Sequence, residues 1–171
     1  AAEEVVSELR RQEEPKLSHQ EESPSFTDIK GTRLLTEGAG QLARMFDGGY
    51  GGFGSAPKFP VPHNLLFLMK MSGEQSEGAR VPSYLAMVEK TLQQMYRGGL
   101  FDHIGGGFSR YSTDEAWLVP HFEKMLYDNA LLVLAYVEAW KLTKNELYLT
   151  VTERTLRYMM RELTHEKGGF Y

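Results

Sequence analysis

Apolar residues recur at three- and four-residue intervals along most of the chain, which is the spacing that gathers them on one face of an α-helix. We predict five such helices, over residues 32–46, 62–71, 82–97, 120–142 and 145–163. Steady two-residue alternation of apolar and polar residues, which would indicate half-buried strands, is not sustained between turns. The pattern therefore predicts an all-α protein with at most short β-bridges in its loops.

Glycine and proline mark the expected helix ends. Proline suits the first turn of a helix, and we expect helices to begin at Pro62, Pro82 and Pro120. Glycine pairs at 98–99 and 168–169 are expected to end two of the helices. The stretch "DGGYGGFGSAPKFPVP" must be a loop because glycine and proline dominate it.

The first thirty residues have a different composition. Residues 1–14, "AAEEVVSELRRQEE", predict a short exposed helix, and they lack the apolar run of a signal peptide. Residues 15–30 are polar and carry two prolines, which indicates a linker. We therefore expect an N-terminal helix and linker over 1–30 and a helical domain over 31–171.

A glycine-rich motif occurs three times, as "FDGGYGGF" (46–53), "FDHIGGGF" (101–108) and "LTHEKGGF" (163–170). Two predicted helices lie between successive copies, which is typical of stacked α-hairpins that bury their faces against neighbours. The two glycines allow positive φ angles, and the phenylalanine can enter the core. The motifs are either purely structural corners or corners that gather at one end of a helical toroid and line its mouth.

Composition and charge exclude several classes of function. The 171 residues have a net charge of -4 and no Lys/Arg cluster, so neither nucleic acid nor a membrane surface is an expected partner. No apolar run approaches the roughly 20 residues of a membrane span. The chain has no cysteine. It also lacks a zinc-protease motif, a phosphate-binding loop and a hydrolase nucleophile motif, so we expect neither a metal nor a cofactor.

Chemically versatile side chains concentrate between residues 103 and 128. They are His103, Arg110, Tyr111, Asp114, Trp117, His121, Glu123, Lys124 and Asp128. On a helix that began at Pro120, His121, Lys124 and Asp128 would share one face. The free N–H groups and positive dipole of that helix start would favour an anionic or hydroxyl-rich ligand.

Aromatic rings, carboxylates and histidines together suit a carbohydrate-like substrate. Our candidate catalytic residues are His121, Glu123 and Asp128. Our candidate substrate-binding residues are Lys58, His103, Arg110, Tyr111, Asp114, Trp117 and Lys124. Glu123 and Asp128 lie on different faces of the predicted helix, so a glycosidase would need a further carboxylate from elsewhere.

Each candidate also has a purely structural interpretation. Glu123 can complement the helix dipole, and Lys124 with Asp128 can form an ordinary i,i+4 pair. Arg110 and Asp114 can tie the loop together. Asp102 can brace the corner, and Trp117 can pack beneath it.

Three stretches, "GGFGSAPKFP", "GGLFDHIGGGFSRYSTDEAW" and "PHFEKMLYDNALL", resemble the helical region of the thioredoxin-domain proteins related to spermatogenesis-associated protein 20. The resemblance extends from about residue 42 to the last residue. It implies a thioredoxin-like domain followed by an (α/α)6 barrel similar to N-acylglucosamine epimerases and six-hairpin glycosidases. The family has no established activity.

The chain departs from the full family pattern because it has no thioredoxin-like domain and too few helices to close a barrel. We expect a fragment that holds the linker and the first hairpins of an incomplete (α/α)6 toroid. Its expected partners are the rest of its own polypeptide and a carbohydrate-like small molecule. The residue choice in the stretches "GGFG" and "DNALL" favours a cytoplasmic bacterial protein. The sequence leaves two functions open. One is an epimerase-like or glycosidase-like activity, and the other is a non-catalytic scaffold coupled to a thioredoxin-like domain.

Overall fold

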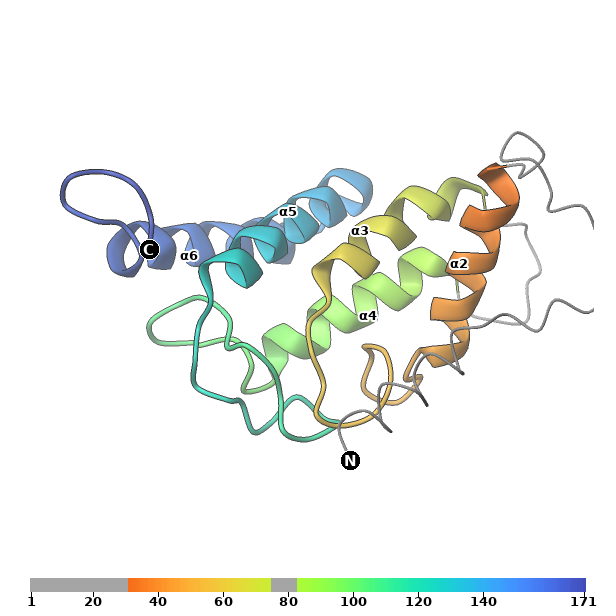
Figure 1. The fold of residues 1–171 in the computed structure, drawn as a ribbon, viewed down its shortest axis with the longest axis horizontal. Coiled ribbons are helices and arrows are strands. Elements are labelled where there is room, and N and C mark those ends of the chain that lie inside the picture. The colour runs from red at the N-terminus through yellow and green to blue at the C-terminus, as the bar shows by residue number, and fades with distance from the viewer. Residues whose placement is uncertain (1–30, 75–82) are drawn as a thin grey trace, which may run out of the picture. The chain divides into compact units, whose positions relative to one another are not determined.

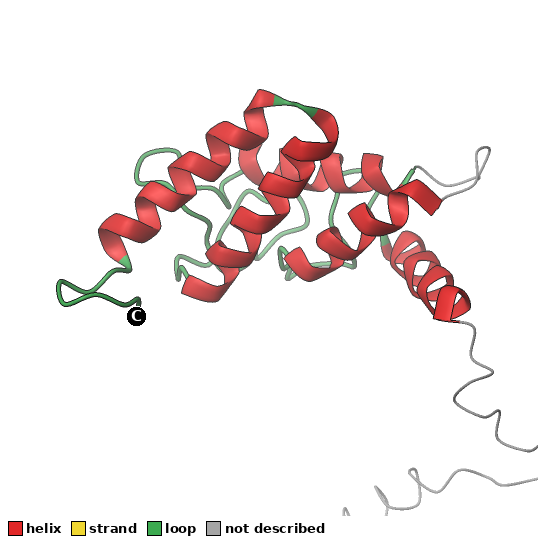
Figure 2. Ribbon diagram, turned by 90° about the horizontal axis from the view of Figure 1, so that it is seen from above, coloured by secondary structure: helices red, strands yellow, loops and turns green. Residues whose placement is uncertain are grey.

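The computed structural model describes residues 31–74 and 83–171. Within these ranges the chain is all-α, with isolated β-bridges and no strand (Figures 1 and 2). The helices are α2 (Gly31–Met45), α3 (Pro62–Met71), the 3-10 helix η1 (Ser72–Glu74), α4 (Tyr84–Arg97), α5 (Leu126–Thr143) and α6 (Glu146–Glu162). The predicted fold class is confirmed. The helix and linker expected over 1–30, and the helix start at Pro82, lie outside the described residues.

From α3 to α6 successive helices run in opposite directions, and the glycine-rich bends after α2, α4 and α6 lie toward the end where α3 and α5 begin (Figure 1). The helices α3 and α5 pack side by side, while α4 packs on α3 and α6 packs on α5. The opposite end carries the tight turn between α5 and α6, where Asn145 accepts a hydrogen bond from the Leu147 amide and so caps α6. The long loops and the starts of α3 and α5 therefore share one rim.

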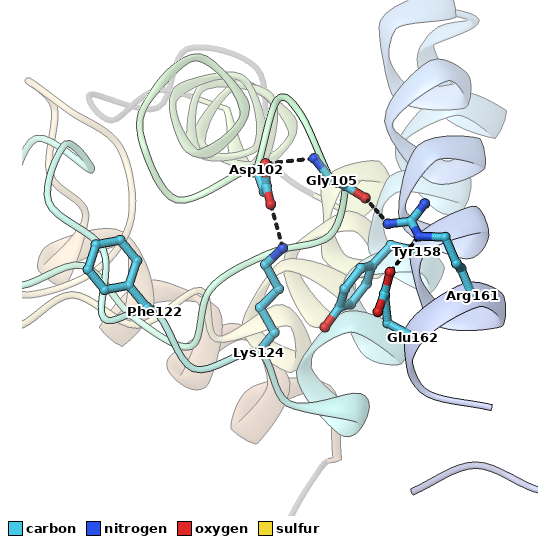
Figure 3. Close-up of a pocket in the computed structure, with 7 residues that line it drawn as sticks. All are labelled: Asp102, Gly105, Phe122, Lys124, Tyr158, Arg161 and Glu162. Atoms are coloured by element: carbon cyan, nitrogen blue, oxygen red, sulfur yellow. Dashed lines mark hydrogen bonds and ion pairs between the residues drawn. The ribbon is translucent and has the colours of Figure 1, made fainter. Parts of the chain in front are cut away.

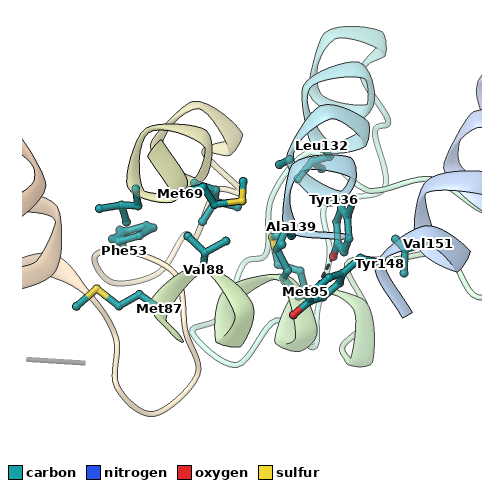
Figure 4. Packing of buried hydrophobic residues seen from close by; sticks show 14 of the residues in the cluster. Phe53, Met69, Met87, Val88, Met95, Leu132, Tyr136, Ala139, Tyr148 and Val151 are labelled. Carbon is teal, nitrogen blue, oxygen red and sulfur yellow. Dashed lines mark hydrogen bonds between the residues drawn. The ribbon is translucent and has the colours of Figure 1, made fainter. Parts of the chain in front are cut away.

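The core lies between α3, α4, α5 and α6 (Figure 4). Its aliphatic and methionine side chains include Leu65, Met87, Leu92 and Leu132, all fully buried. Full burial of such a side chain stabilises the fold by about 1.5–3 kcal/mol. Tyr136 is also buried, and its hydroxyl donates to the Leu92 carbonyl at 2.7 Å, which satisfies the polar atom inside the core.

The start of α5 differs from the prediction. The helix begins at Leu126 rather than at Pro120, because the preceding backbone is hydrogen-bonded to another loop segment. The Arg110 amide donates to the Glu123 carbonyl at 2.8 Å, and the His121 amide donates to the Tyr111 carbonyl at 2.9 Å. The expected helical face shared by His121, Lys124 and Asp128 is therefore wrong, and so is the expected helix start at Pro120.

The first two bends have the same backbone geometry, which confirms the repeat. Residues 46–53 and 101–108 each close with a Phe–Phe β-bridge. Both glycines of each Gly-Gly-Phe motif have positive φ. The phenylalanines that end these two bends are buried, as predicted, whereas Phe170 of the third bend is 52% exposed. The third bend is also tighter than the first two. Its His165 amide donates to the Gly169 carbonyl, whereas the Asp47 and Asp102 amides donate to the Gly52 and Gly107 carbonyls, one residue further along.

Candidate functional site

Three segments of the long loops pair by backbone hydrogen bonds at the rim. Lys58 and Ser112 exchange two backbone bonds of 2.8 and 2.9 Å, and a further bridge joins Ser112 to Pro120. We call residues 120–124 the rim segment. Because its backbone is paired with residues 110–112, its alternate side chains point to opposite sides.

A pocket of about 280 Å³ opens where α3 and α5 begin, and we call it the rim pocket. Its lining residues are Phe59, Pro60, Val61, Pro62, His63, Arg110, Tyr127, Asp128 and Leu131. Val61 caps α3 with φ 39° and ψ 57°, a left-handed conformation that β-branched residues rarely adopt. Such strained positions cluster at functional sites.

Aromatic rings form a continuous stack beside the rim pocket. The Tyr111 ring lies 4.8 Å from the Phe59 ring and 4.7 Å from the His121 ring, measured between centroids. The Tyr111 and His121 planes are only 19° apart, so the two rings stack face to face. The stack places three aromatic rings beside the polar groups of the rim.

Charged groups meet at the same place. Arg110 Nη1 donates to Glu123 Oε2 at 2.9 Å, and His121 Nδ1 lies 4.0 Å from that oxygen. The pKa of Asp128 is raised, first because burial disfavours its charged form, although the positive charge of Arg110 opposes this effect. Asp128 is therefore a carboxyl group that holds its proton more tightly than an exposed aspartate.

The structure brings five of the predicted site residues together at this rim, namely Arg110, Tyr111, His121, Glu123 and Asp128. Arg110 and Asp128 line the rim pocket itself. The other three adjoin it through the aromatic stack and the ion pair. Sequence spacing suggested that they are close, but the arrangement depends on a paired loop rather than on a helix face.

Lys58 and Trp117, predicted to bind substrate, are both completely buried. Lys58 Nζ donates to Asp47 Oδ2 at 2.6 Å, to the Gly51 carbonyl at 3.0 Å and to the Glu115 carbonyl at 2.8 Å. Its ammonium also lies 5.3 Å from the centre of the Trp117 ring. Both side chains hold loops together and, in this structure, have no surface to offer a ligand.

Asp114 and His103 also lie away from the rim pocket. The Asp114 carboxylate accepts hydrogen bonds from the amides of Ala116, Leu118 and Val119, which favours its structural interpretation as a loop brace. The exposed His103 ring contacts the Phe101 ring at 5.2 Å within the second bend.

Lys124 borders a second pocket, of about 330 Å³, which we call the bend pocket (Figure 3). The residues that line it are Asp102, Gly105, Phe122, Lys124, Tyr158, Arg161 and Glu162. The hydrogen bond from Lys124 lowers the pKa of Asp102 to about 2. Phe122 and Lys124 thus face this pocket, while His121 and Glu123 face the aromatic stack.

Sequence reasoning missed Phe59, His63 and Tyr127, which also contribute to the rim. His63 follows the proline that begins α3, and Phe59 precedes the Pro60-Val61-Pro62 turn. A signal existed in both cases, because an aromatic residue and a histidine flank a helix start. Tyr127 could be assigned only once the first turn of α5 was known.

Within residues 31–74 and 83–171, no group of three or more metal-ligating side chains gathers to hold an ion. None of the helices in the same ranges is long and apolar enough to cross a membrane.

Two curated proteins are similar to most of this chain in sequence. It is 47% identical over 133 residues to spermatogenesis-associated protein 20 of Homo sapiens, a match that covers 77% of this chain and 17% of that protein. Over these 133 residues the chain is homologous to part of spermatogenesis-associated protein 20. The Mus musculus homologue is 44% identical over the same share of each chain. The chain thus spans about a sixth of the length of these homologues. No family model matches the chain.

Solved structures show the fold class. Cellobiose 2-epimerase from Spirochaeta thermophila matches with a TM-score of 0.65 and 21% identity, covering 86% of this chain and 41% of that one. Cellobiose 2-epimerase from Bacillus thermoamylovorans matches with a TM-score of 0.61 and 16% identity, covering 81% and 40%. A sugar epimerase from a ruminal bacterium matches with a TM-score of 0.58 and 15% identity, covering 79% and 39%. The described hairpins therefore correspond to part of an (α/α)6 toroid.

Proposed function

We propose that the rim pocket binds a sugar ring and that the protein acts on a carbohydrate by proton transfer, as a sugar epimerase does. The observation that carries the proposal is the meeting of the Phe59–Tyr111–His121 stack, the Arg110–Glu123 ion pair and the partly buried Asp128 at one pocket. Sugar rings combine an apolar face, which suits aromatic rings, with hydroxyl groups, which suit charged hydrogen-bonding partners.

The roles follow from chemistry. Tyr111 and His121 would support the ring, and Arg110 would donate to hydroxyl oxygens. Epimerisation removes a proton from a carbon beside a carbonyl and returns one to the opposite face, so it needs an acid and a base. Asp128, whose pKa is raised, suits the acid. His121 is placed to act as the base, because an imidazole nitrogen can accept a proton. Glu123 would hold Arg110 and His121 in place.

The number of carboxyl groups that line the rim pocket favours epimerisation over glycoside hydrolysis. Hydrolysis requires two carboxyl groups that flank the scissile bond. Asp128 is the one carboxyl among the described residues that line the rim pocket. The three solved structures of similar fold are named as sugar or cellobiose epimerases, which supports the same class of reaction.

The second candidate is a non-catalytic scaffold that binds a partner protein or a thioredoxin-like domain in a longer polypeptide of the cytoplasm. It is favoured by apolar side chains that point into solvent from the rim loops. Leu118 is 65% exposed, and Phe122 is 87% exposed.

A nitrogen-15 NMR titration with cellobiose, glucose and N-acetylglucosamine separates the candidates. Sugar binding predicts saturable shifts of the amides of Tyr111, His121 and Asp128, with weaker binding by Asp128→Asn and Tyr111→Ala. Glu166→Gln, at an exposed position of the third bend, is the charge-matched control and is expected to bind normally. Unchanged rim amides at saturating sugar concentrations would leave the scaffold as the better explanation.

A further inference from the structure

The start of α3 differs from the starts of α4, α5 and α6. The residues that precede those three helices, Ser83, Met125 and Asn145, all have extended backbones, as N-cap residues usually do. Val61, which precedes α3, has φ 39° and ψ 57°, and its side chain gives the helix no capping hydrogen bond. The chain therefore enters α3 through a left-handed corner at Val61.

Three properties of the sequence oppose this conformation. A left-handed backbone crowds the Cβ atom of any L-residue. A branched Cβ atom increases the crowding, so valine is rarely found in this conformation. Val61 also precedes Pro62, and a proline ring favours an extended backbone in the residue before it. Glycine would form the same corner without strain, so the presence of a valine needs a physical reason.

The corner is held from both sides. On one side, the Lys58 backbone exchanges two hydrogen bonds with the loop that follows the second bend, and its side chain is fully buried. On the other side, Pro62 is buried in the first turn of α3. Only residues 59–61 join these two fixed points, and the ring of Pro60 fixes its own φ. Rotation about the Val61 backbone therefore changes where the neighbouring side chains point.

Side chains on both sides of the corner belong to the rim pocket. The Phe59 ring, before the corner, lies 4.8 Å from the Tyr111 ring at one end of the aromatic stack. The exposed His63 side chain, after the corner, lines the same pocket. Val61 lies between them, and its partly buried side chain packs against the hydrophobic core. The valine thus ties the corner to the core between two groups that a ligand would meet.

We propose that Val61 is a positioning residue of the rim pocket, whose branched side chain locks the corner and so fixes the Phe59 ring and the His63 imidazole for a ligand. This role rests on the sugar site proposed above. A branched side chain has few rotamers, and its contact with the core keeps the corner in one conformation. Strain at the corner lowers stability, as strained residues at binding sites do. A pocket that is fixed beforehand loses less conformational freedom on binding.

Glycine and alanine variants of Val61 measure the strain. Both variants remove the branched side chain, but only Val61→Gly also removes the crowding at Cβ. At an unstrained position alanine is the more stable of the two, because glycine has more freedom in the unfolded chain. We expect the reverse order here, with Val61→Gly melting about 2–4 °C above Val61→Ala.

Two NMR measurements on Val61→Gly then test the positioning role. Without sugar, nuclear Overhauser contacts between the Phe59 and Tyr111 rings should be weaker than in the parent chain, because the unlocked corner moves. With cellobiose as the probe, binding should weaken about tenfold, because the free corner must be ordered on binding. Lys144 is the matched control, since it has φ 57° and ψ 22° at the opposite end of α5. Lys144→Gly should also melt above Lys144→Ala, and both should keep the ring contacts and cellobiose binding of the parent.

The ring contacts measured without sugar separate the positioning role from the proposed function. If the parent chain binds no sugar, the proposed function fails, and the ring contacts alone decide the role of Val61. Ring contacts in Val61→Gly that equal those of the parent overturn the positioning role. Equal cellobiose binding by the parent and Val61→Gly also overturns it, while the proposed function stands. A lower melting temperature for Val61→Gly than for Val61→Ala overturns it as well, because the corner would then carry no strain.

Discussion

Arg110 and Glu123 are joined twice, once through their backbones and once through their side chains. The Arg110 amide donates to the Glu123 carbonyl at 2.8 Å, and its guanidinium donates to Glu123 Oε2 at 2.9 Å. The double link places a positive and a negative charge beside Asp128, and each acts on its pKa.

The first prediction concerns the pKa of Asp128. Arg110 lowers it and Glu123 raises it, against a background of burial that raises it most. Arg110→Met should therefore raise the pKa further, and Glu123→Gln should lower it. A carbon-13 NMR titration of the Asp128 carboxyl measures both, with Glu115→Gln as an exposed control. Shifts of the same sign in the two variants would contradict the ion-pair geometry.

The second prediction concerns acid stability. The pKa of Asp102 is lowered to about 2 by Lys124, so the ionised form is favoured in the folded state. A depressed pKa contributes stability above the unfolded-state value and loses it as pH falls through the folded value. Asp102→Asn should be less stable than the parent chain near neutral pH. The gap should shrink as pH falls from about 4 to about 2. Urea unfolding across this range tests it, and a pH-independent gap would rule the mechanism out.

The third prediction separates backbone strain from steric clash at the bends. Gly52 and Gly168 both have positive φ, at 80° and 89°. Of these two positions, only Gly52 would bring an added methyl group against an aromatic ring, that of Trp117. Gly168→Ala should cost about 1–2 kcal/mol from its left-handed conformation. Gly52→Ala should cost a further 1–3 kcal/mol, roughly, from overpacking. Gly48→Ala, in open space and without positive φ, is the control. Equal thermal-unfolding losses at Gly52 and Gly168 would contradict the close contact with Trp117.

The fourth prediction compares two lysines, Lys58 and Lys124, that each hold a bend through an aspartate and a carbonyl. Lys58→Met leaves the Asp47 carboxylate and two carbonyls without their shared cation inside the loops. Breaking a buried ion pair in this way costs about 3–5 kcal/mol. Lys124→Met should cost less, because water reaches that ammonium. Denaturant unfolding of both variants provides the comparison, and a larger loss for Lys124 would reverse our ranking.

The fifth prediction concerns self-association. Leu134 and Leu142 of α5 are about half exposed and line an apolar groove of about 390 Å³ between α3 and α5. Exposed apolar patches of this kind favour association. The chain should therefore sediment as larger species as its concentration rises, and Leu134→Glu with Leu142→Lys should reduce this. Leu156→Lys on α6 is the control. A parent chain that remains monomeric at all concentrations would contradict the prediction.

Helix periodicity and the three glycine motifs predicted most of the fold. The ends of α2, α3 and α6 fall within one or two residues of expectation, and Pro62 and the Asn145 cap set two of them locally. The expectation that Gly168-Gly169 ends the last helix is wrong, because α6 already ends at Glu162 with Leu163 as its cap. The start of α5 could not be found this way. Pro120 and Glu123 are good helix-start residues, but pairing with residues 110–112 overrides that preference.

The sequence predicted which residues lie close together better than it predicted how they are arranged. The density of polar and aromatic residues singled out Arg110, Tyr111 and Asp128, which the structure brings to one rim. It could not separate them from Lys58 and Trp117, because burial depends on which loops fold over them. Local sequence gives no measure of such long-range contacts.

The length of the rim segment is fixed by the side chains on either side of it. His121 and Glu123 face the aromatic stack, and Phe122 and Lys124 face the bend pocket. Insertion or deletion of one residue between Pro120 and Met125 would exchange the two sets, since neighbouring side chains on an extended backbone alternate. Phenylalanine, after an insertion, or lysine, after a deletion, would then replace the carboxylate at Arg110, and the second bend would lose its cation. Natural length variation is therefore expected elsewhere along the loop.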